Sequence, residues 1–428
     1  MNRYKSSEAY YKRAVKTIPL ASQTFSKSVT QFPYGVSPLF IEKGKGSTVT
    51  DLDGNVYLDF VNALASVTLG YCDPDVDRAV KLQLENGVSF TLPHRLEAEV
   101  AEKIVSMVPC AEQVRFAKNG SDATSGALRI ARAYTGRDHV AVCGYHGWQD
   151  WYIGSTTRNL GVPESTQQLT HKFSYNNISS LSSLFDQHPG KIAAVIMEPM
   201  NVEYPENEFL DQVKILAHKA GALLIFDETI TGFRYSLGGA QEYFGVIPDL
   251  ATFGKGLANG FPLSAVVGSR KIMQKMEEVF FSGTFGGETL SLAAASAVLD
   301  KLEAQDVIGD LNRKGLWLQK ELDDLIERHT LGEVFTTAGH PSWSFLLIGE
   351  GKTADSFKLK TLFLQEMFKR GIITLGSHNL SFSHSRADLE TLISAYDSVL
   401  PMIMEADRNG RVDEMLSCEP LTPLFKVR

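Results

Sequence analysis

Short aliphatic runs alternate with segments of helical periodicity between residues 113 and 227. Four of these runs have the length of a strand, at residues 113–117, 139–143, 193–198 and 222–227. Residues 121–134 and 209–220 carry apolar side chains at helical spacing, and a glycine closes each of the two segments. Strands that are joined through helices pair in parallel, and the helices cover both faces of the sheet. The alternation predicts an α/β fold with a mainly parallel sheet.

A chain of 428 residues is long enough for a large domain and a smaller one. We expect the large domain at residues 71–308, around the alternating segment. The smaller domain is expected to be α+β and to form from both chain ends. Residues 1–70 would supply a small meander of strands, and residues 309–428 would supply amphipathic helices with further strands.

Composition and charge restrict the classes of partner. The formal net charge is -8, which argues against nucleic acid or a membrane surface as the main partner. No run of about 18 apolar residues occurs, and the polar first residues lack a signal-peptide core, so a cytoplasmic protein is expected. No zinc or other metal site is predicted, because the four cysteines form no CxxC pair; they are Cys72, Cys110, Cys143 and Cys418.

Two ionisable residues stand at the ends of apolar segments. Lys255 lies between two glycines after an apolar approach, and Asp227 ends the run 222–227. Ligands of an open parallel sheet bind beyond the carboxyl ends of its strands, where both residues would lie. Pyridoxal 5'-phosphate (PLP) requires a lysine for its imine and an acid that keeps its ring nitrogen protonated. The pair therefore indicates a Schiff-base cofactor site.

Both residues have alternative interpretations. A lone Gly-Lys-Gly is usually a surface turn, and Asp227-Glu228 after an aliphatic run is also typical of the Walker B strand of an ATPase. That strand requires an earlier GxxxxGK[ST] loop. The Gly-Lys-Thr at residues 351–353 follows the acidic strand, and Leu346 stands where the loop needs its first glycine. Order and spacing therefore argue against the ATPase.

Two further segments lie just after predicted strands. Gly120, Ser121 and Asp122 stand at the expected start of a helix, where free amides and the helix dipole attract a phosphate. The alternative is an ordinary N-cap without a ligand. Tyr145 lies in a glycine-flanked turn at residues 144–148, from which its ring could stack on a pyridine ring, and the alternative is a packed loop.

In these segments the chain resembles the class III, fold type I PLP aminotransferases, and most of all the glutamate-1-semialdehyde aminomutase-like branch. The similarity extends from Ser37 to His384. Its two most specific parts are the Asp-Glu…Thr-Gly-Phe-Arg block at 227–234 and the Gly-Lys-Gly block, at their mutual spacing. The other matching segments are residues 51–59, 119–124, 131–137, 145–147 and 198–199.

The resemblance implies the PLP-dependent transferase fold type I, with a seven-stranded-type sheet in the large domain. It implies that Lys255 forms the internal aldimine and then shuttles a proton, and that Asp227 pairs with the pyridinium nitrogen. The cofactor-binding residues implied by the family are Gly120, Ser121, Asp122, Tyr145, Glu198, Asn201, Asp227, Thr229, Lys255 and Thr284. Thr284 would reach the phosphate of the neighbouring subunit, which implies a homodimer with shared active sites.

The implied activity is transfer of an amino group from an amino-acid donor to an aldehyde or ketone acceptor. A sugar-like compound or a specialised-metabolite precursor is a suitable acceptor. The alternative is a glutamate-1-semialdehyde 2,1-aminomutase, which needs no second substrate. A third interpretation is a scaffold that has lost catalysis, and the presence of both Lys255 and Asp227 argues against it.

Three departures from the family pattern bear on the substrate. Asp122 stands where glutamate is common, and Thr229 stands where many members have valine. Residues 371–382 contain neither an arginine for an α-carboxylate nor the glutamate usual in the aminomutase, and His378 or Asn379 falls near that place. We therefore favour the aminotransferase over the aminomutase.

Overall fold

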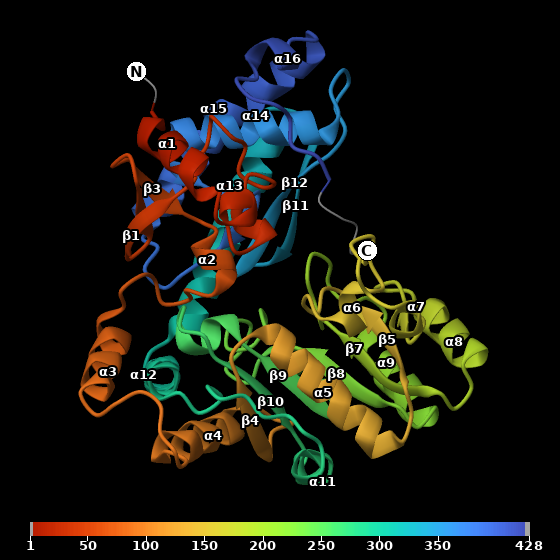
Figure 1. The fold of residues 1–428 in the computed structure, drawn as a ribbon. Helices are drawn as coiled ribbons and strands as arrows, with labels where there is room; N and C mark the ends of the chain where they lie inside the picture. Colours follow the sequence, from red (N-terminus) through yellow and green to blue (C-terminus); the bar gives the residue numbers. More distant parts are fainter. Residues whose placement is uncertain (1–2, 424–428) are drawn as a thin grey trace. The chain divides into compact units, whose positions relative to one another are not determined.

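The computed structural model describes residues 3–423 and divides into two compact units. The large unit contains residues 65–67 and 74–308. The small unit contains the described residues before 65, residues 68–73 and the described residues from 309 onward. Figure 1 shows the ribbon of each unit.

A seven-stranded sheet forms the centre of the large unit (Figure 1). The strands follow the order β4-β10-β9-β8-β7-β5-β6 across the sheet. Neighbouring strands pair in parallel except at β10, which is antiparallel to both β4 and β9. This confirms the expected mainly parallel sheet. The strands are β4 (Gln113–Ala117), β5 (His139–Cys143), β6 (Thr170–Lys172), β7 (Ile192–Met197), β8 (Leu223–Asp227), β9 (Leu250–Phe253) and β10 (Ser264–Gly268).

Alternate residues of the strands enter two hydrophobic cores, one on each face of the sheet. In β5, Val140 and Val142 pack with residues of α5 (Gly120–Thr135). Ala141 belongs to the other core, with residues of α8 (Ile178–Gln187) and α9 (Phe209–Lys219). Because side chains alternate along a strand, this division places helices on both faces, as the sequence predicts.

Helix ends in the large unit follow capping chemistry. α4 (Arg95–Met107) begins with a capping box in which the His94 side chain accepts the N–H of Leu96 and the Glu97 carboxylate accepts the N–H of His94. α5 ends at Gly136, whose φ of 67° places it in the left-handed region that glycine adopts easily. The remaining helices are α3 (Pro74–Leu84), α6 (Asp150–Ile153), α7 (Glu164–Gln167), α10 (Ala240–Phe244), α11 (Arg270–Met273), α12 (Thr289–Ala304), η3 (Lys255–Ala258) and η4 (Gln274–Glu277).

The small unit contains two small sheets, and both chain ends contribute to it, as expected. β3 and β13 pair in parallel in the first sheet, with Leu58 opposite Ile372. The first sheet consists of β1 (Ile41–Lys45), β2 (Thr48–Asp51), β3 (Val56–Asp59) and β13 (Ile372–Ile373), and the second of β11 (Phe335–His340), β12 (Trp343–Ile348) and β14 (Ser377–Asn379). Helices of this part of the chain are α1 (Lys5–Ala14), η1 (Pro19–Ala21), η2 (Phe25–Lys27), α13 (Val307–Arg328), α14 (Ser356–Lys369), α15 (Arg386–Arg408) and α16 (Val412–Met415).

The turn labelled α2 (Asn62–Ala65) is left-handed. Its φ values run from 45° at Asn62 to 65° at Ala65, and none of its residues is glycine. Left-handed backbone costs about 1–2 kcal/mol per residue with a side chain. Side-chain bonds hold its start, because Asp59 accepts the N–H of Asn62 at 3.0 Å and Asn62 donates to the carbonyl of Asn379.

One strand begins later than its sequence suggests. Residues 37–42 have a strand pattern, but β1 starts at Ile41. Pro38 has no N–H to donate to a ladder, which disfavours pairing at that position. Among residues 3–423, no helix combines the length and the apolar character that crossing a bilayer requires.

Candidate active site

Asp227 and Lys255 lie at the same edge of the seven-stranded sheet. Asp227 is the last residue of β8, and Lys255 begins η3 just after β9 ends. β8 and β9 pair in parallel with Asp227 opposite Thr252. Parallel strands share their carboxyl ends along one edge, which is where open α/β sheets bind ligands. The structure thus brings together the two residues that the sequence singles out.

The buried carboxylate of Asp227 accepts hydrogen bonds on both oxygens. Oδ1 accepts from the N–H of Thr229 at 3.1 Å, from the Thr229 hydroxyl at 2.6 Å and from the Thr252 hydroxyl at 3.1 Å. Oδ2 lies 2.9 Å from Nδ1 of His146. Burial alone would raise the pKa of Asp227, but the bonds from His146 and Thr229 outweigh it and lower the pKa below its ordinary value. Asp227 is therefore ionised at neutral pH.

His146 is a member of this network that the sequence did not reveal. Its side chain is fully buried, with Nδ1 facing Asp227 and Nε2 lying 3.2 Å from the carbonyl of Cys143. The bond to Asp227 spans 81 residues, so no local pattern points to it. The available signal was its position inside the Tyr-His-Gly segment that follows β5. Thr252, one strand away from Asp227, was missed for the same reason.

Lys255 has a left-handed backbone conformation and an amine with a lowered pKa. Its φ is 44°, in the left-handed region that side chains rarely adopt, and such strain gathers at functional sites. Burial lowers the pKa of Lys255 to about 8, while the charges of Glu198 and Asp227 act to raise it and that of Arg234 to lower it. A substantial fraction of the amine is consequently neutral at slightly alkaline pH, as a nucleophile or base requires.

The start of α5 offers backbone donors to an anion. The N–H groups of Asp122 and Ala123 bond to the carbonyl of Asn119, at 3.0 and 3.2 Å. Those of Gly120 and Ser121 are the first of the helix and have no partner within it, so they are the donors that a phosphate would use. The macrodipole of the 16-residue helix favours a negative charge at this end.

Thr229 packs between this helix start and the loop of Lys255. A Cβ on Gly120 would lie 3.1 Å from Cγ2 of Thr229, and one on Gly254 would lie 3.3 Å from the same atom. The glycines thus allow both backbones to approach the Thr229 methyl group, while its hydroxyl bonds to Asp227. The start of α5, the carboxylate of Asp227 and the loop of Lys255 are therefore neighbours in one site.

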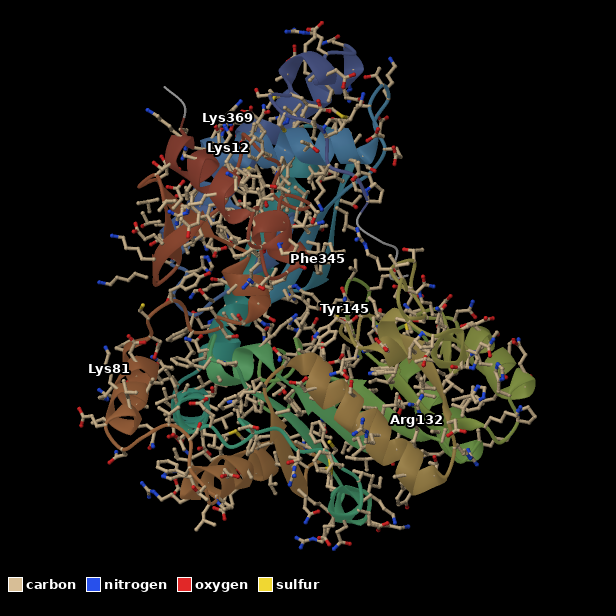
Figure 2. The ribbon with its side chains drawn as sticks, viewed as in Figure 1. Lys12, Lys81, Arg132, Tyr145, Phe345 and Lys369 are labelled. Atoms are coloured by element: carbon tan, nitrogen blue, oxygen red, sulfur yellow. The ribbon has the colours of Figure 1, made fainter. Side chains whose placement is uncertain are left out.

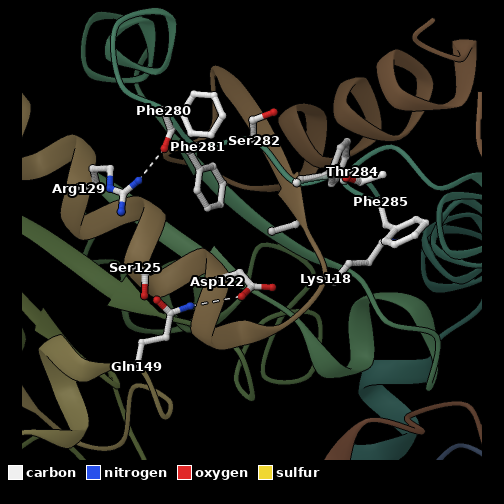
Figure 3. Close-up of a pocket in the computed structure, with 14 residues that line it drawn as sticks. Lys118, Asp122, Ser125, Arg129, Gln149, Phe280, Phe281, Ser282, Thr284 and Phe285 are labelled. Carbon is white, nitrogen blue, oxygen red and sulfur yellow. Dashed lines mark hydrogen bonds between the residues drawn. The ribbon is translucent and has the colours of Figure 1, made fainter. Parts of the chain in front are cut away.

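The side chains of Ser121 and Asp122 are already engaged. The Ser121 hydroxyl accepts the N–H of Trp148 at 3.3 Å, and Gly147 fits against it only because it lacks a Cβ. The Asp122 carboxylate accepts the N–H of Asn119 at 2.9 Å and the amide of Gln149 at 3.4 Å (Figure 3). A carboxylate has no proton to donate to a phosphate, so Asp122 shapes the helix start.

Tyr145, Glu198 and Asn201 form a second group of the expected residues. Tyr145 follows β5 and is 45% exposed, so part of its ring is open to a ligand (Figure 2). Its backbone N–H donates to Oε2 of Glu198 at 3.0 Å, and the amide of Asn201 donates to Oε1 at 3.0 Å. Glu198 is buried, and its charge acts on the amine of Lys255. The group therefore adjoins the lysine.

Thr284 lies on the loop after Phe280, in a pocket that Asp122 at the start of α5 also lines. It is exposed and lines a pocket of about 410 Å³ together with Ser125, Arg129 and the loop that follows Phe280 (Figure 3). Arg129 holds this loop by donating to the carbonyl of Phe280 at 2.6 Å. The loop thus presents Thr284 at the surface, and its role toward a second subunit stays a prediction.

His378 is turned into the core of the small unit. Its Nδ1 lies 2.9 Å from the Ser344 hydroxyl and its Nε2 lies 2.8 Å from the Tyr396 hydroxyl. Burial lowers the pKa of His378 to about 3, so the ring is neutral. The neighbouring Asn379 donates its amide to the carbonyl of Val61 at 2.7 Å. His378 therefore has no free nitrogen with which to hold a substrate carboxylate.

The residues at the sheet edge fit PLP. The N–H groups at the start of α5 that have no partner within the helix suit its phosphate, and the ionised Asp227 suits a protonated ring nitrogen. Oδ2 of Asp227 has His146 as its one partner among the described residues and can accept a further donor. The partly neutral amine of Lys255 suits a carbonyl carbon.

Comparison with known proteins agrees with this fit. Residues 31–380 match the family Aminotransferase class-III. The chain is 33% identical over 374 residues to 3-aminobutyryl-CoA aminotransferase of Cloacimonas acidaminovorans (strain Evry), covering 85% of this chain and 89% of that protein. It is 36% identical over 392 residues to glutamate-1-semialdehyde 2,1-aminomutase of Persephonella marina (strain DSM 14350 / EX-H1), covering 85% and 91%.

Solved structures share the fold. The FumI protein of Sphingopyxis sp. MTA144, solved in a PLP-containing form, superposes with a TM-score of 0.87 at 28% identity and covers 96% of this chain and 98% of that chain. The family match spans most of the sequence and contains every residue of the sheet-edge site. The chain therefore belongs to the class-III aminotransferase family and is a PLP-dependent aminotransferase or aminomutase of fold type I.

Proposed function

We propose that the protein is an aminotransferase that moves an amino group from an amino-acid donor to an aldehyde or ketone acceptor. We favour an aminotransferase over an aminomutase because residues 371–382 contain no arginine and no glutamate. The ionisable side chain of this segment, His378, is engaged with Ser344 and Tyr396. The family resemblance leads us to expect a carboxylate-binding group in this segment, and the segment offers no charged side chain, so we favour a neutral, hydroxylated or sugar-like acceptor.

Bound PLP supplies an electron-withdrawing ring that stabilises negative charge at the carbon carrying the amino group. Asp227 would hold the proton on the ring nitrogen through Oδ2, since its lowered pKa keeps it ionised. Thr229, Thr252 and His146 fix the orientation of that carboxylate. Gly120 and Ser121 would bind the phosphate through their N–H groups, and the Tyr145 ring would cover one face of the cofactor.

Lys255 would carry the proton transfers. Its amine must be neutral to accept a proton from the substrate carbon, and burial lowers its pKa to about 8. The charges of Glu198 and Asp227 would stabilise the protonated form that results. Because Lys255 sits on a short helix between buried strands, its nitrogen is held near one place and can return the proton to a neighbouring carbon.

The competing function is the aminomutase, supported by the 36% identity to the Persephonella marina enzyme. The two functions differ in substrate number. An aminotransferase needs a donor and a separate acceptor, whereas glutamate-1-semialdehyde would be converted without a partner by an aminomutase.

The test is a nitrogen-transfer assay on the purified holoenzyme. A panel of ¹⁵N-labelled α-, β- and ω-amino donors is incubated with aldehyde and ketone acceptors, and the products are analysed by mass spectrometry. We expect labelled product from a donor and acceptor together, and no conversion of glutamate-1-semialdehyde alone. Conversion of the semialdehyde alone, with no transfer between any pair, would establish the aminomutase instead.

A further inference from the structure

Three histidines meet on one face of the large sheet, away from the cofactor site. His139 begins β5, His171 lies in β6 and His188 follows the last turn of α8. β5 and β6 pair in parallel with Ala141 opposite His171. Residue 139 points to the same face as residue 141, so the two histidines are diagonal neighbours on that face. α8 packs on this face and adds His188.

The three rings are in direct contact. Nδ1 of His139 lies 2.8 Å from Nε2 of His171. The ring centroids of His171 and His188 are 4.0 Å apart, and those of His139 and His188 are 5.0 Å apart. One nitrogen from each ring falls within 4.8 Å of the others, and all three side chains are half-buried. Solvent can therefore reach a compact set of three imidazole nitrogens.

The set is separate from the chemistry proposed above. Asp227 ends its strand, whereas His139 begins a strand that runs in the same direction. The two ends of the five-residue β5 are about 13 Å apart at 3.3 Å per residue. None of the three histidines forms a hydrogen bond with a residue of the sheet-edge site. Their spacing in the sequence matches no metal-binding motif.

We propose that His139, His171 and His188 bind one divalent transition-metal ion, with Zn²⁺ as the representative. Three imidazoles are a donor set for zinc and its neighbours in the first transition row, and they leave further positions for water or an outside ligand. This departs from the sequence-based expectation of no metal, which rested on the cysteines. The histidines are 32 and 17 residues apart in the chain, so only folding brings them together.

Binding requires small rearrangements that the site permits. Zinc–nitrogen bonds of about 2.0–2.1 Å place tetrahedral ligand atoms about 3.3 Å from one another. The 2.8 Å pair would open slightly and the longer separations would close through ring rotation. The imidazole that donates the His139–His171 bond would keep one proton and move it to its other nitrogen, so no net charge is lost.

The charged side chains near the three histidines include both signs, so some attract a metal cation and others repel it. A neutral imidazole offers one nitrogen lone pair to a metal ion, so protons and the ion compete for each of the three rings. The charge of Asp138 acts on His139 in the direction that favours a cation, while those of Lys191 and Arg132 oppose it. The imidazoles therefore supply most of the affinity.

The experiment is a zinc titration of the tag-free holoenzyme, after removal of excess PLP and of bound metal by a chelator and dialysis. Isothermal calorimetry with ZnCl₂ is expected to show one saturable site per chain. His171→Ala and His188→Ala should each weaken that site at least about tenfold. His218→Ala is the matched control, because His218 is a surface histidine that bonds to Asp249 instead. It should bind as the unaltered protein does.

Co²⁺ provides a second readout. Visible d–d bands should appear on adding one equivalent to the unaltered protein and to the His218 variant, and should be absent in His188→Ala. Circular dichroism melting identifies any variant that does not fold, and the remaining variant then decides. Absence of saturable binding in the unaltered protein, or equal affinity in a folded His171 or His188 variant, overturns the proposal.

Discussion

At the residue scale, hydrogen bonds determine the charge of Asp227. The carboxylate is buried, yet its pKa is lowered, because hydrogen bonds from His146 and Thr229 compensate for the loss of solvent. Its position at the end of an aliphatic strand could be predicted from the sequence. Its imidazole partner could not, because His146 lies in the segment after β5, 81 residues earlier in the chain.

Replacing this charge tests its role. We predict that Asp227→Asn folds normally and loses about 10- to 150-fold in kcat, since the ring nitrogen would lose a charged partner worth roughly 1.5–3 kcal/mol. Steady-state kinetics with the best donor and acceptor measures the loss. Asp211→Asn makes the same chemical change on an exposed face of α9 and should leave kcat unaltered. A kcat within twofold of the unaltered enzyme in Asp227→Asn would contradict the assignment.

In the cofactor-free protein, the amine of Lys255 should lose its proton at a lower pH than exposed lysines do. Its pKa is lowered to about 8, so it should become reactive as the pH rises through 8, well before exposed lysines at about 10.4. Because the pKa of Lys255 is lower in the folded protein than in the unfolded chain, its protonation lowers the free energy of unfolding. This penalty is complete below about pH 8, decreases as the pH rises from about 8 to about 10.4 and is absent above that pH. Trace acetylation with peptide mapping across pH 6–11 measures the titration. A midpoint near 10 would show that the amine is not desolvated.

At the element scale, chain connectivity explains which strands were recognised. The strands between long helices, such as β5 and β8, were predicted at or close to their observed bounds. Residues 263–268 form an apolar run, and its pattern alone does not give the direction of the strand. Ten residues separate Phe253 from Ser264, which is fewer than a parallel crossover needs, so β10 must reverse.

Helices α3 and α8 and strand β6 were not predicted. β6 has only three residues, and α8 is rich in serine, which weakens its helical pattern. β6 folds by pairing with β5 at the edge of the sheet, and α8 folds by packing on one face of it. The histidine cluster could not be predicted for the same reason, since His171 lies in β6 and His188 directly follows α8.

The left-handed turn at Asn62–Ala65 gives a prediction about backbone strain. Ala63→Gly should stabilise the protein by up to about 1 kcal/mol, because glycine adopts a φ of 49° without a Cβ clash. Ala98→Gly, in the right-handed helix α4, should destabilise by about the same amount. Urea unfolding of both variants measures the difference. Destabilisation of similar size in both would show that the turn is unstrained.

At the scale of the whole molecule, the sequence predicts two units but not how a second chain would meet them. The pattern at both ends indicated a smaller α+β domain, and the pairing of β3 with β13 joins those ends in one sheet. Thr284 is exposed on its loop, where its side chain could contact a neighbouring subunit. The proposal of a shared site in a homodimer follows from that exposure and the resemblance.

Subunit complementation tests this sharing. Lys255→Ala and Thr284→Ala chains are each expected to be impaired as homodimers, the second through weaker phosphate binding. Mixed dimers should recover up to half of the activity per dimer, because one site would combine an intact Lys255 with the partner's intact threonine. If Thr284 serves its own chain, no mixed site is intact and activity stays at the level of the Thr284→Ala sites.

The most direct test of the sheet-edge site is the visible absorption spectrum of the purified holoenzyme, followed by borohydride reduction and peptide mapping. We predict a yellow cofactor band that an effective amino donor bleaches. Before donor is added, reduction should fix the cofactor to Lys255, and Lys255→Ala should take up no such label. A label on another lysine, or no cofactor band after reconstitution with PLP, would contradict the assignment of Lys255.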